Sequence, residues 1–564
     1  MKMKTKNDFH KQIISLEGKK AGAYRDLDGQ YDFSEFIMTF EIVQGEMKRT
    51  SARIRIRVPF TVAKFPRDVF STPSRTMGAC DYLTRLMSDS LQSIPKKNNR
   101  LKDVRAVVTK PGDQIIPSSA MIIDRDAIEV RLTTTLPVQR GTLPASEALQ
   151  LLTEAIPGCV RSCLLYAEME STGLVKWIES CEDADTARAQ LNSQGLVAFI
   201  AEGSIIAEPL QKRDGVTNKG IHVPDEHAVT LELPNRGEVR GIGIPQGITV
   251  ITGGRREGKT ACIRALELGI YNHAPGTGRE LVVTSRDAVG IASQPGRAVT
   301  EVDVMRILGE SAGRRERLAT LNAGGEASVA ASIMETLEIG TSCMIFDEDR
   351  TPVTLLGRDA RMQALVPDTD GRMMTLCDVL PVLRDELKVS SVIAVTGFGD
   401  YLDIADTVIV MNDGIPEVVT DKAKKIAATE GTPRKREHTP TLVRQRPRRP
   451  LQHSLAPQKD ESHSTYKPQG RDIIVQYGDD FIDITGLTQI VSQAQGRTLS
   501  RSLALVHRLA SSGMTVPDVV NRVITRIDQV GLDTLSPRIM GDLAMIREQD
   551  LAAVLNRWRR LRIT

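Results

Sequence analysis

A glycine-rich octapeptide, Gly253 to Thr260, constrains the fold of this chain more than any other feature. It reads Gly-Gly-Arg-Arg-Glu-Gly-Lys-Thr and fits the pattern G-x-x-x-x-G-K-[ST] without a mismatch. Residues 247–252 before it are typical of a buried strand, and residues 260–271 after it carry apolar side chains at helical spacing. This order of strand, loop and helix predicts an α/β fold with a phosphate-binding loop.

The residue types in this loop indicate a nucleoside triphosphate as the ligand. Glycines let successive backbone N–H groups turn towards phosphate oxygens, and the helix N-terminus adds a positive dipole. We expect Lys259 to contact the β- and γ-phosphates and the Thr260 hydroxyl to ligate Mg²⁺. The alternative is a glycine turn that merely joins a strand to a helix. The expected nucleotide-binding residues of the loop are Gly253, Gly254, Arg255, Arg256, Glu257, Gly258, Lys259, Thr260 and Ala261.

A second candidate element is the run Ser342 to Glu348, a short apolar stretch that ends in two carboxylates. Such a run is typical of a buried parallel strand. At its end, Asp347 is expected to hold Mg²⁺ through water, and Glu348 is expected to polarise the attacking water as general base. An acidic strand end that only faces solvent is the alternative, and the upstream phosphate-binding loop makes it the weaker one.

A third element is the stretch Asn322 to Ser328, where Gly324 and Gly325 open a helix that leads into the acidic strand. Read alone, it is also compatible with an ordinary glycine-rich helix cap.

Taken together, the motifs resemble those of the ABC-class ATPases, in the same order along the chain. The resemblance implies an ABC-type P-loop core that uses ATP and Mg²⁺. It also implies a homodimer in which the amides of Gly324 and Gly325 close over the γ-phosphate held by the other copy. The same roles follow for Lys259 on phosphate, Thr260 and Asp347 on Mg²⁺, and Glu348 on water. The resembling stretches are residues 243–247, 269–273 with 275–276, 347–349, 358–363, 399–401, 405–407 and, more weakly, 532–537.

This sequence departs from the family pattern in several places, and one is the loop itself, where Arg255, Arg256 and Glu257 are charged but leave the glycines in place. Ala323 stands where the family carries a serine, and Ser328 is a candidate substitute. Gly397 follows the strand 391–396 where the family has a histidine that contacts the γ-phosphate, so we expect a slow ATPase. Arg358 and Arg361 are candidates for charge stabilisation, with a solvated helix face as an equal alternative.

The length of 564 residues gives room for several domains. We expect an N-terminal α+β accessory domain at 1–136, a helical segment at 137–203 and the ATPase core at 204–421. A basic flexible linker at 422–471 and a C-terminal α/β extension at 472–564 follow.

The composition and the first residues of the sequence indicate the cellular compartment of the protein. No apolar run reaches the ~20 residues of a membrane span, and the first twenty residues do not resemble a secretory signal. The seven cysteines lack paired metal spacing, which indicates a reducing, intracellular compartment.

Positive charge is clustered although the net charge is only +3. Arg53, Arg55 and Arg57 alternate with apolar residues, so one face of a strand is expected to carry three arginines. Like charges on one sheet face repel unless something anionic meets them, which favours RNA as a ligand. The linker and the C-terminal end add further arginines, for which an ordinary solvated charge run is the alternative.

The family resembled here includes a kinetoplastid mitochondrial member associated with RNA editing. That resemblance favours RNA and, if it holds, the mitochondrial matrix rather than the cytoplasm. We therefore expect an ATPase that couples closure or dimerisation to RNA binding, with other proteins of an RNA-processing or RNA-editing complex as candidate partners. The alternatives are an ATP-gated scaffold for a protein complex without direct RNA binding, and a small-molecule kinase, for which no acceptor motif stands out.

Overall fold

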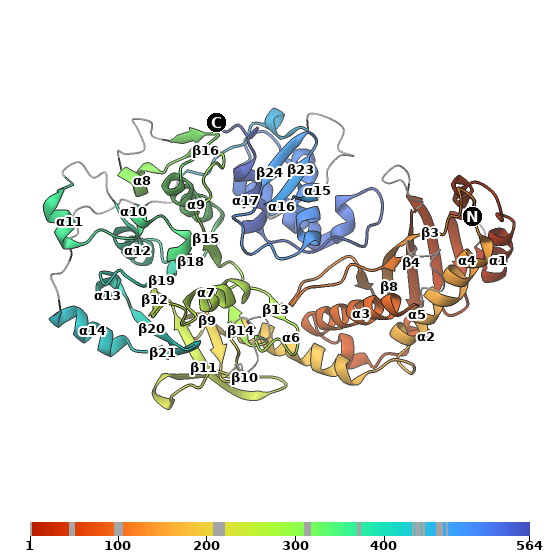
Figure 1. Cartoon of the computed structure of the whole chain (residues 1–564), viewed down its shortest axis with the longest axis horizontal. Coiled ribbons are helices and arrows are strands. Elements are labelled where there is room, and N and C mark those ends of the chain that lie inside the picture. The colour runs from red at the N-terminus through yellow and green to blue at the C-terminus, as the bar shows by residue number, and fades with distance from the viewer. Residues whose placement is uncertain are drawn as a thin grey trace. The chain divides into compact units, whose positions relative to one another are not determined.

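The structure is a computed structural model, and two compact units can be distinguished in it (Figure 1). Unit 1 comprises Met1–Glu182 with Leu532–Met545, and unit 2 comprises Asp183–Gly531 with Ile546–Thr564. The described residues are 3–43, 51–94, 105–206, 220–309, 317–368, 374–430, 434, 442, 446–457, 466–469 and 472–564. We describe each unit separately.

Unit 1 is built on a mostly antiparallel sheet with the strand order β1-β2-β3-β4-β8-β5, and β7 pairs with β8. Along β4, Ile54 and Ile56 are fully buried, and the arginines between them lie on the other face. The predicted two-faced strand is therefore present. The strands of this sheet are β1 (Lys4–Thr5), β2 (Gly29–Asp32), β3 (Ile37–Val43), β4 (Ser51–Pro59), β5 (Ala106–Val107), β7 (Met121–Ile123) and β8 (Ala127–Thr135), and β6 (Gln114–Ile115) lies outside it.

Helices pack against this sheet and complete the core of unit 1. The longest, α3 (Pro73–Ser93), has Thr72 as its N-cap and Pro73 in its first turn. Gly78 lets α3 approach α6 closely, because a Cβ at that position would lie 2.9 Å from the Trp177 carbonyl oxygen. The other helices are α1 (Lys6–Ile14), α2 (Phe60–Ala63), α4 (Ala145–Leu149), α5 (Ile156–Leu164) and α6 (Thr172–Gln190), whose last residues belong to unit 2.

Unit 2 contains a parallel core sheet with the order β15-β18-β19-β12-β20-β21, in which only β21 is antiparallel. A second, antiparallel sheet has the order β10-β11-β9-β14. The central strands of the parallel sheet are short and buried on both sides, as in β18 and β19, where all residues are buried. The core sheet comprises β12 (Ile248–Gly253), β15 (Val289–Ile291), β18 (Cys343–Asp347), β19 (Ser390–Ala394), β20 (Thr407–Asn412) and β21 (Ile415–Val418). The second sheet comprises β9 (Leu196–Ala201), β10 (Ala228–Leu233), β11 (Gly237–Pro245) and β14 (Val282–Thr284).

The helix α7 (Lys259–Leu268) lies between the two sheets, packing against β12, β18 and β19 of one and β14 of the other. α9 (Gly325–Ile339) packs against β15, and α12 (Leu376–Asp385) packs against β12 and β19. Both helices contribute to one large hydrophobic core with the parallel strands. Shorter elements are α8 (Met305–Leu308), α10 (Val353–Leu356), α11 (Ala360–Leu365), α13 (Tyr401–Ile404), α14 (Thr420–Thr429), β13 (Asn272–His273), β16 (Val299–Val302) and β17 (Leu318–Thr320).

The C-terminal region combines the antiparallel strands β22 (Tyr466–Gln469), β23 (Asp472–Tyr477) and β24 (Asp480–Asp483) with three helices. These are α15 (Gln493–Leu509), α16 (Val516–Val530) and α17 (Glu548–Arg557). α15 packs on β23, and α17 packs on α9 of the ATPase core (Figure 1). The region is thus an α/β extension joined to the core of unit 2, apart from the segment Leu532–Met545, which belongs to unit 1.

Two predicted boundaries differ from the structure. The helical segment 137–203 is not one unit, because α4 and α5 pack in unit 1 whereas β9 pairs within the second sheet of unit 2. The predicted linker 422–471 lies partly outside the described residues, and where it is described it is anchored. Leu442 is 1% exposed and Arg448 is fully buried.

Candidate functional site

The loop between β12 and α7 has backbone geometry that requires its glycines. Gly253 and Gly258 have φ of 142° and 99°, values that side chains disfavour. A Cβ on Gly253 would lie 2.5 Å from the Met411 carbonyl oxygen. Glu257 fixes the other side of the loop, because its carboxylate accepts from the Asp413 N–H at 2.5 Å. The predicted strand, loop and helix are therefore present in the predicted order.

Lys259 is bent back over its own loop. Its Nζ donates to the carbonyl oxygens of Gly253 at 3.0 Å and Gly254 at 2.8 Å, and the residue is only 9% exposed. These are neutral acceptors, and a phosphate is a stronger partner for an ammonium group. Arg255 and Arg256 are exposed at the outer side of the loop. The ammonium is thus held at the loop by contacts that an anion can replace.

Asp347 ends β18 and is 1% exposed. Its Oδ1 accepts from the Asp349 N–H at 3.1 Å, and its Oδ2 is a buried oxygen without a hydrogen-bond partner among the described residues. Burial raises the pKa of this carboxyl group. A buried carboxylate oxygen without a partner is a costly arrangement unless a cation or a donor meets it.

The Thr260 hydroxyl lies beside Asp349, whereas Asp347 is the carboxylate predicted to bind the same Mg²⁺ as Thr260. It donates to Asp349 Oδ2 at 3.2 Å. Asp349 is exposed and belongs to the resembling stretch 347–349, but its own part in the site was not predicted. Its position two residues after Asp347 was the only signal in the sequence.

Glu348 is held by the strand next to its own. Its carboxylate accepts from the Thr396 backbone N–H at 2.7 Å and from the Thr396 hydroxyl. Thr396 follows β19, which lies between β18 and β12 in the sheet. The sequence offered no signal for this contact, because only the strand order brings the two residues together. Gly397, where the family has its histidine, has no side chain. The residue directly before it, Thr396, makes its polar contact with Glu348.

Gly324 and Gly325 form the start of α9, with Gly324 as an extended N-cap. Ser328 does not face the open end of the helix. It is fully buried, its hydroxyl donates to the Gly325 carbonyl at 2.7 Å, and it accepts from the Gln294 N–H at 2.9 Å. The expectation that Ser328 substitutes for the serine missing at position 323 is therefore wrong. Its helical position points it inward.

Two further arginines of the sequence analysis lie on or beside the short helix α11. Arg358 donates to the Met362 carbonyl at 3.1 Å and so contacts its own segment, whereas Arg361 is exposed.

The arginine face of β4 carries its own counter-charges. Arg57 pairs with Asp124 at 2.5 Å, and Arg55 lies 4.0 Å from Glu129 of the neighbouring strand β8. Two of the three arginines thus have internal counter-charges, so an external anion is not required to balance Arg55 and Arg57. The face remains partly exposed, with Arg55 and Arg57 side chains 30% and 37% accessible.

Several arginines expected in basic clusters are structural. Arg434 pairs with Asp378 at 2.5 Å, Arg560 with Asp480 at 3.2 Å, and Arg448 with Glu338 at 2.6 Å in a pair that is almost fully buried. Arg557 is 6% exposed and donates to Gln294. These side chains are committed to internal partners, so they do not form a phosphate-binding surface.

No helix within the described ranges is both long enough and apolar enough to cross a membrane. The same part of the chain holds no group of three or more histidine, cysteine or acidic side chains suited to a metal ion.

Three family models match the chain in succession. The model for the N-terminal region of ATPases of the ABC class matches residues 6–167, and the ABC ATPase P-loop domain matches residues 170–448. The MRB1590 C-terminal domain matches residues 466–564. The chain belongs to the ABC-class ATPase family. The predicted family and fold class, an ABC-type P-loop core with an N-terminal and a C-terminal region, are confirmed.

The individual proteins that the chain resembles share 25% sequence identity or less with it. The uncharacterized protein MJ1628 of Methanocaldococcus jannaschii is 25% identical over 291 residues, which are 44% of this chain and 63% of the relative. The chain thus spans less than two thirds of the relative's length. Among solved structures, cbiO1 of Clostridium perfringens, part of the ABC transporter complex cbiONQ, is 15% identical with a TM-score of 0.25, covering 42% of this chain and 92% of its own. The ADP conformation of MJ1267, an ATP-binding cassette of an ABC transporter, is 12% identical with a TM-score of 0.22, covering 34% and 88%.

Asp347 at the end of β18 and Thr260 at the start of α7 fit the Mg²⁺ that usually accompanies nucleotide in this family. The unpartnered Oδ2 of Asp347 and the hydroxyl of Thr260 are hard oxygen donors of the kind that Mg²⁺ prefers. These two residues would hold the ion.

Proposed function

We propose that this ABC-class protein binds ATP with Mg²⁺, hydrolyses it slowly, and couples nucleotide-driven closure or dimerisation to RNA binding. One observation carries the proposal. The carboxyl ends of the neighbouring strands β12, β19 and β18 bring Lys259, Thr396 and the pair Asp347–Glu348 to the same edge of one parallel sheet. Ligands of open α/β sheets bind at this edge.

Nucleotide binding follows from the loop. The N–H groups at the start of α7 point towards the loop, and Lys259 can exchange the carbonyl oxygens of Gly253 and Gly254 for phosphate oxygens. Bound Mg²⁺ would neutralise phosphate charge between Thr260 and Asp347.

Hydrolysis needs a base that removes a proton from the attacking water. Glu348 is the carboxylate at the correct strand end, and Thr396 keeps it there through two donors. Gly397 in place of the family's histidine leaves the γ-phosphate one contact short, which supports slow turnover.

Closure rests on the exposed start of α9. The first N–H groups of a helix are unpaired and favour anions, so Gly324 and Gly325 are suited to the γ-phosphate held by a second copy. The test is sedimentation of Glu348→Gln with and without ATP. The ATP-bound variant is expected to form a compact dimer, and an unchanged profile would contradict this mode of assembly.

RNA binding is the third part of the proposal. It rests on the partly exposed Arg53, Arg55 and Arg57 and on the match of residues 466–564 to the MRB1590 C-terminal domain. The test is filter binding of single-stranded RNA homopolymers across a salt series, with and without ATP. Salt-dependent binding supports RNA as the ligand, because neutralised phosphates release counterions.

An ATP-gated scaffold without direct RNA binding is the second candidate. The observation in its favour is that Asp124 and Glu129 already meet two of the strand arginines. Absence of RNA binding at low salt, together with ATP-dependent sedimentation, would favour the scaffold.

A further inference from the structure

Glu267, at the end of α7, is a buried acid that the proposed function does not use. Its side chain is fully buried and bridges two arginines. Arg350 donates to Oε1 at 2.8 Å and to Oε2 at 3.3 Å, and Arg264 donates to Oε2 at 3.4 Å. A buried carboxylate requires such compensation, so Glu267 and Arg350 fix one another.

Arg350 also lies beside the expected metal-binding carboxylate. It follows Asp347 by three residues, and its Nε lies 3.8 Å from Asp347 Oδ2. Both atoms are buried and lack a hydrogen-bond partner among the described residues. Because the two terminal nitrogens of the guanidinium are committed to Glu267, the remaining nitrogen stays beyond hydrogen-bond distance of Asp347.

This geometry keeps an oxygen of Asp347 free. Asp347 is 1% exposed and the Arg350 side chain is 24% accessible, so the two charges attract each other in a largely buried site, and an unrestrained Arg350 would close onto Asp347 as a charged hydrogen-bonded pair. Such a pair would compete with a divalent cation for the same oxygen. Glu267 prevents that competition because it accepts hydrogen bonds from both terminal nitrogens of the Arg350 guanidinium.

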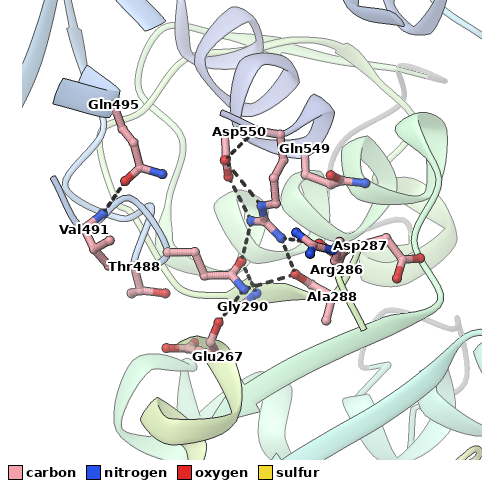
Figure 2. A network of polar contacts seen from close by, with 12 residues as sticks. Glu267, Arg286, Asp287, Ala288, Gly290, Thr488, Val491, Gln495, Gln549 and Asp550 are labelled. Atoms are coloured by element: carbon pink, nitrogen blue, oxygen red, sulfur yellow. Dashed lines mark hydrogen bonds and ion pairs between the residues drawn. The ribbon is translucent and has the colours of Figure 1, made fainter. Parts of the chain in front are cut away.

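The C-terminal region in turn holds Glu267. Gln489 Nε2 donates to the Glu267 backbone carbonyl at 2.9 Å, and the Thr488 carbonyl accepts from Arg264 at 2.5 Å. Figure 2 shows this junction, with Glu267 on α7 facing Gly290 of β15 and Thr488 of the C-terminal region. The packing is tight, because a Cβ on Gly290 would lie 2.3 Å from Glu267 Oε1 and 3.1 Å from Thr488 Oγ1.

Arg547 fixes the other side of Gln489. It donates to Gln489 Oε1 at 3.0 Å and to the Ala288 carbonyl at 2.8 Å, and Asp550 balances its charge at 2.8 Å. Gln489 also accepts from the Gly290 N–H at 3.2 Å. Ala288, Gly290 and Asp550 are drawn in the same network (Figure 2). The C-terminal region is therefore hydrogen-bonded to the strand and the helix that flank Glu267.

We propose that Glu267 is a positioning residue that withholds Arg350 from Asp347, and that the C-terminal region maintains this arrangement through Gln489 and Thr488. The C-terminal region thereby sets how strongly Mg²⁺ supports nucleotide binding. This inference rests on the proposed function, since it assigns a role to residues around the same metal site.

The experiment measures the affinity of the full chain for a fluorescent ATP analogue in Mg²⁺ and in EDTA. The measured quantity is the dissociation constant in EDTA divided by the dissociation constant in Mg²⁺, which is large when Mg²⁺ supports nucleotide binding. Glu267→Gln should lower this ratio by about tenfold, within the range of coupling between contacting groups. Addition of Arg350→Met to that variant should restore the ratio, because the competing guanidinium is gone. Gln489→Ala should change the ratio in the same direction as Glu267→Gln, but less.

A matched control is Glu338→Gln, which removes the charge of another buried glutamate, 2.6 Å from Arg448, and should leave the ratio unchanged. If Glu267→Gln does not fold, the single variant Arg350→Met tests the inference instead. The inference predicts a ratio equal to or higher than that of wild type, whereas a merely structural role of Arg350 predicts a lower ratio. A restored ratio supports the inference, and a double variant that is no better than Glu267→Gln overturns it. A wild-type ratio near one would instead count against the proposed metal site itself.

Discussion

The contact between Thr396 and Glu348 gives the sharpest prediction about turnover. Thr396→Val removes the hydroxyl donor to the Glu348 carboxylate and retains the backbone N–H donor at 2.7 Å. A hydrogen bond to a charged group contributes about 1.5–3 kcal/mol. Because Thr396 is exposed, the substitution should leave the fold intact. If the hydroxyl positions the general base, a loss of about 1.5 kcal/mol lowers the hydrolysis rate roughly tenfold.

The assay is single-turnover hydrolysis of ATP with the protein in excess, combined with a separate measurement of ATP affinity. The affinity should stay within about twofold of wild type, because Thr396 does not contact the phosphate-binding loop among the contacts described. Thr249→Val is the matched control. Its buried hydroxyl, also at the core sheet, has no hydrogen-bond partner in the described part of the chain. Wild-type hydrolysis by Thr396→Val would refute the role assigned to the hydroxyl.

Three further predictions concern other parts of the molecule. Lys259→Ala should abolish nucleotide binding by equilibrium dialysis, and retained binding would remove the loop from the account. Changing Arg53, Arg55 and Arg57 to serine should weaken RNA binding and lower the slope of affinity against salt by at most about two; weaker binding with an unchanged slope would indicate indirect damage. Burial, aided by Arg279, lowers the pKa of His273 from 6.5 to about 4, so the unfolded chain binds more protons between these values. Stability should therefore fall by about 3 kcal/mol as pH drops from 6.5 to 4, and His273→Gln should lose less in thermal denaturation across that range.

Local patterns predicted the elements that carry the site. The loop 253–260, the acidic strand end at Asp347 and the alternating strand of Arg53 to Arg57 each depend on residues close together in sequence. Their strand, helix and burial patterns are present as expected. Periodicity and glycine placement report such short-range geometry directly.

Contacts between distant residues were not predictable in this way. In the sequence, Arg448 belongs to the basic linker and Glu338 to a distant helix. Only the fold brings them together as a buried ion pair. Thr396 meets Glu348 because β19 lies beside β18, and Gln489 meets Glu267 because the C-terminal region packs on the ATPase core. The internal partners of Arg434, Arg448 and Arg560 could not be predicted for the same reason, since they lie far away along the chain.

The most direct test of the central claim is ATP turnover by the purified chain in Mg²⁺, compared between wild type and Glu348→Gln. The account predicts slow but measurable hydrolysis by wild type. It predicts ATP binding of similar affinity without hydrolysis by Glu348→Gln, because the glutamine retains the shape of the side chain and lacks the base. Hydrolysis at the wild-type rate by Glu348→Gln would contradict the assignment of this carboxylate, and with it the proposed mechanism.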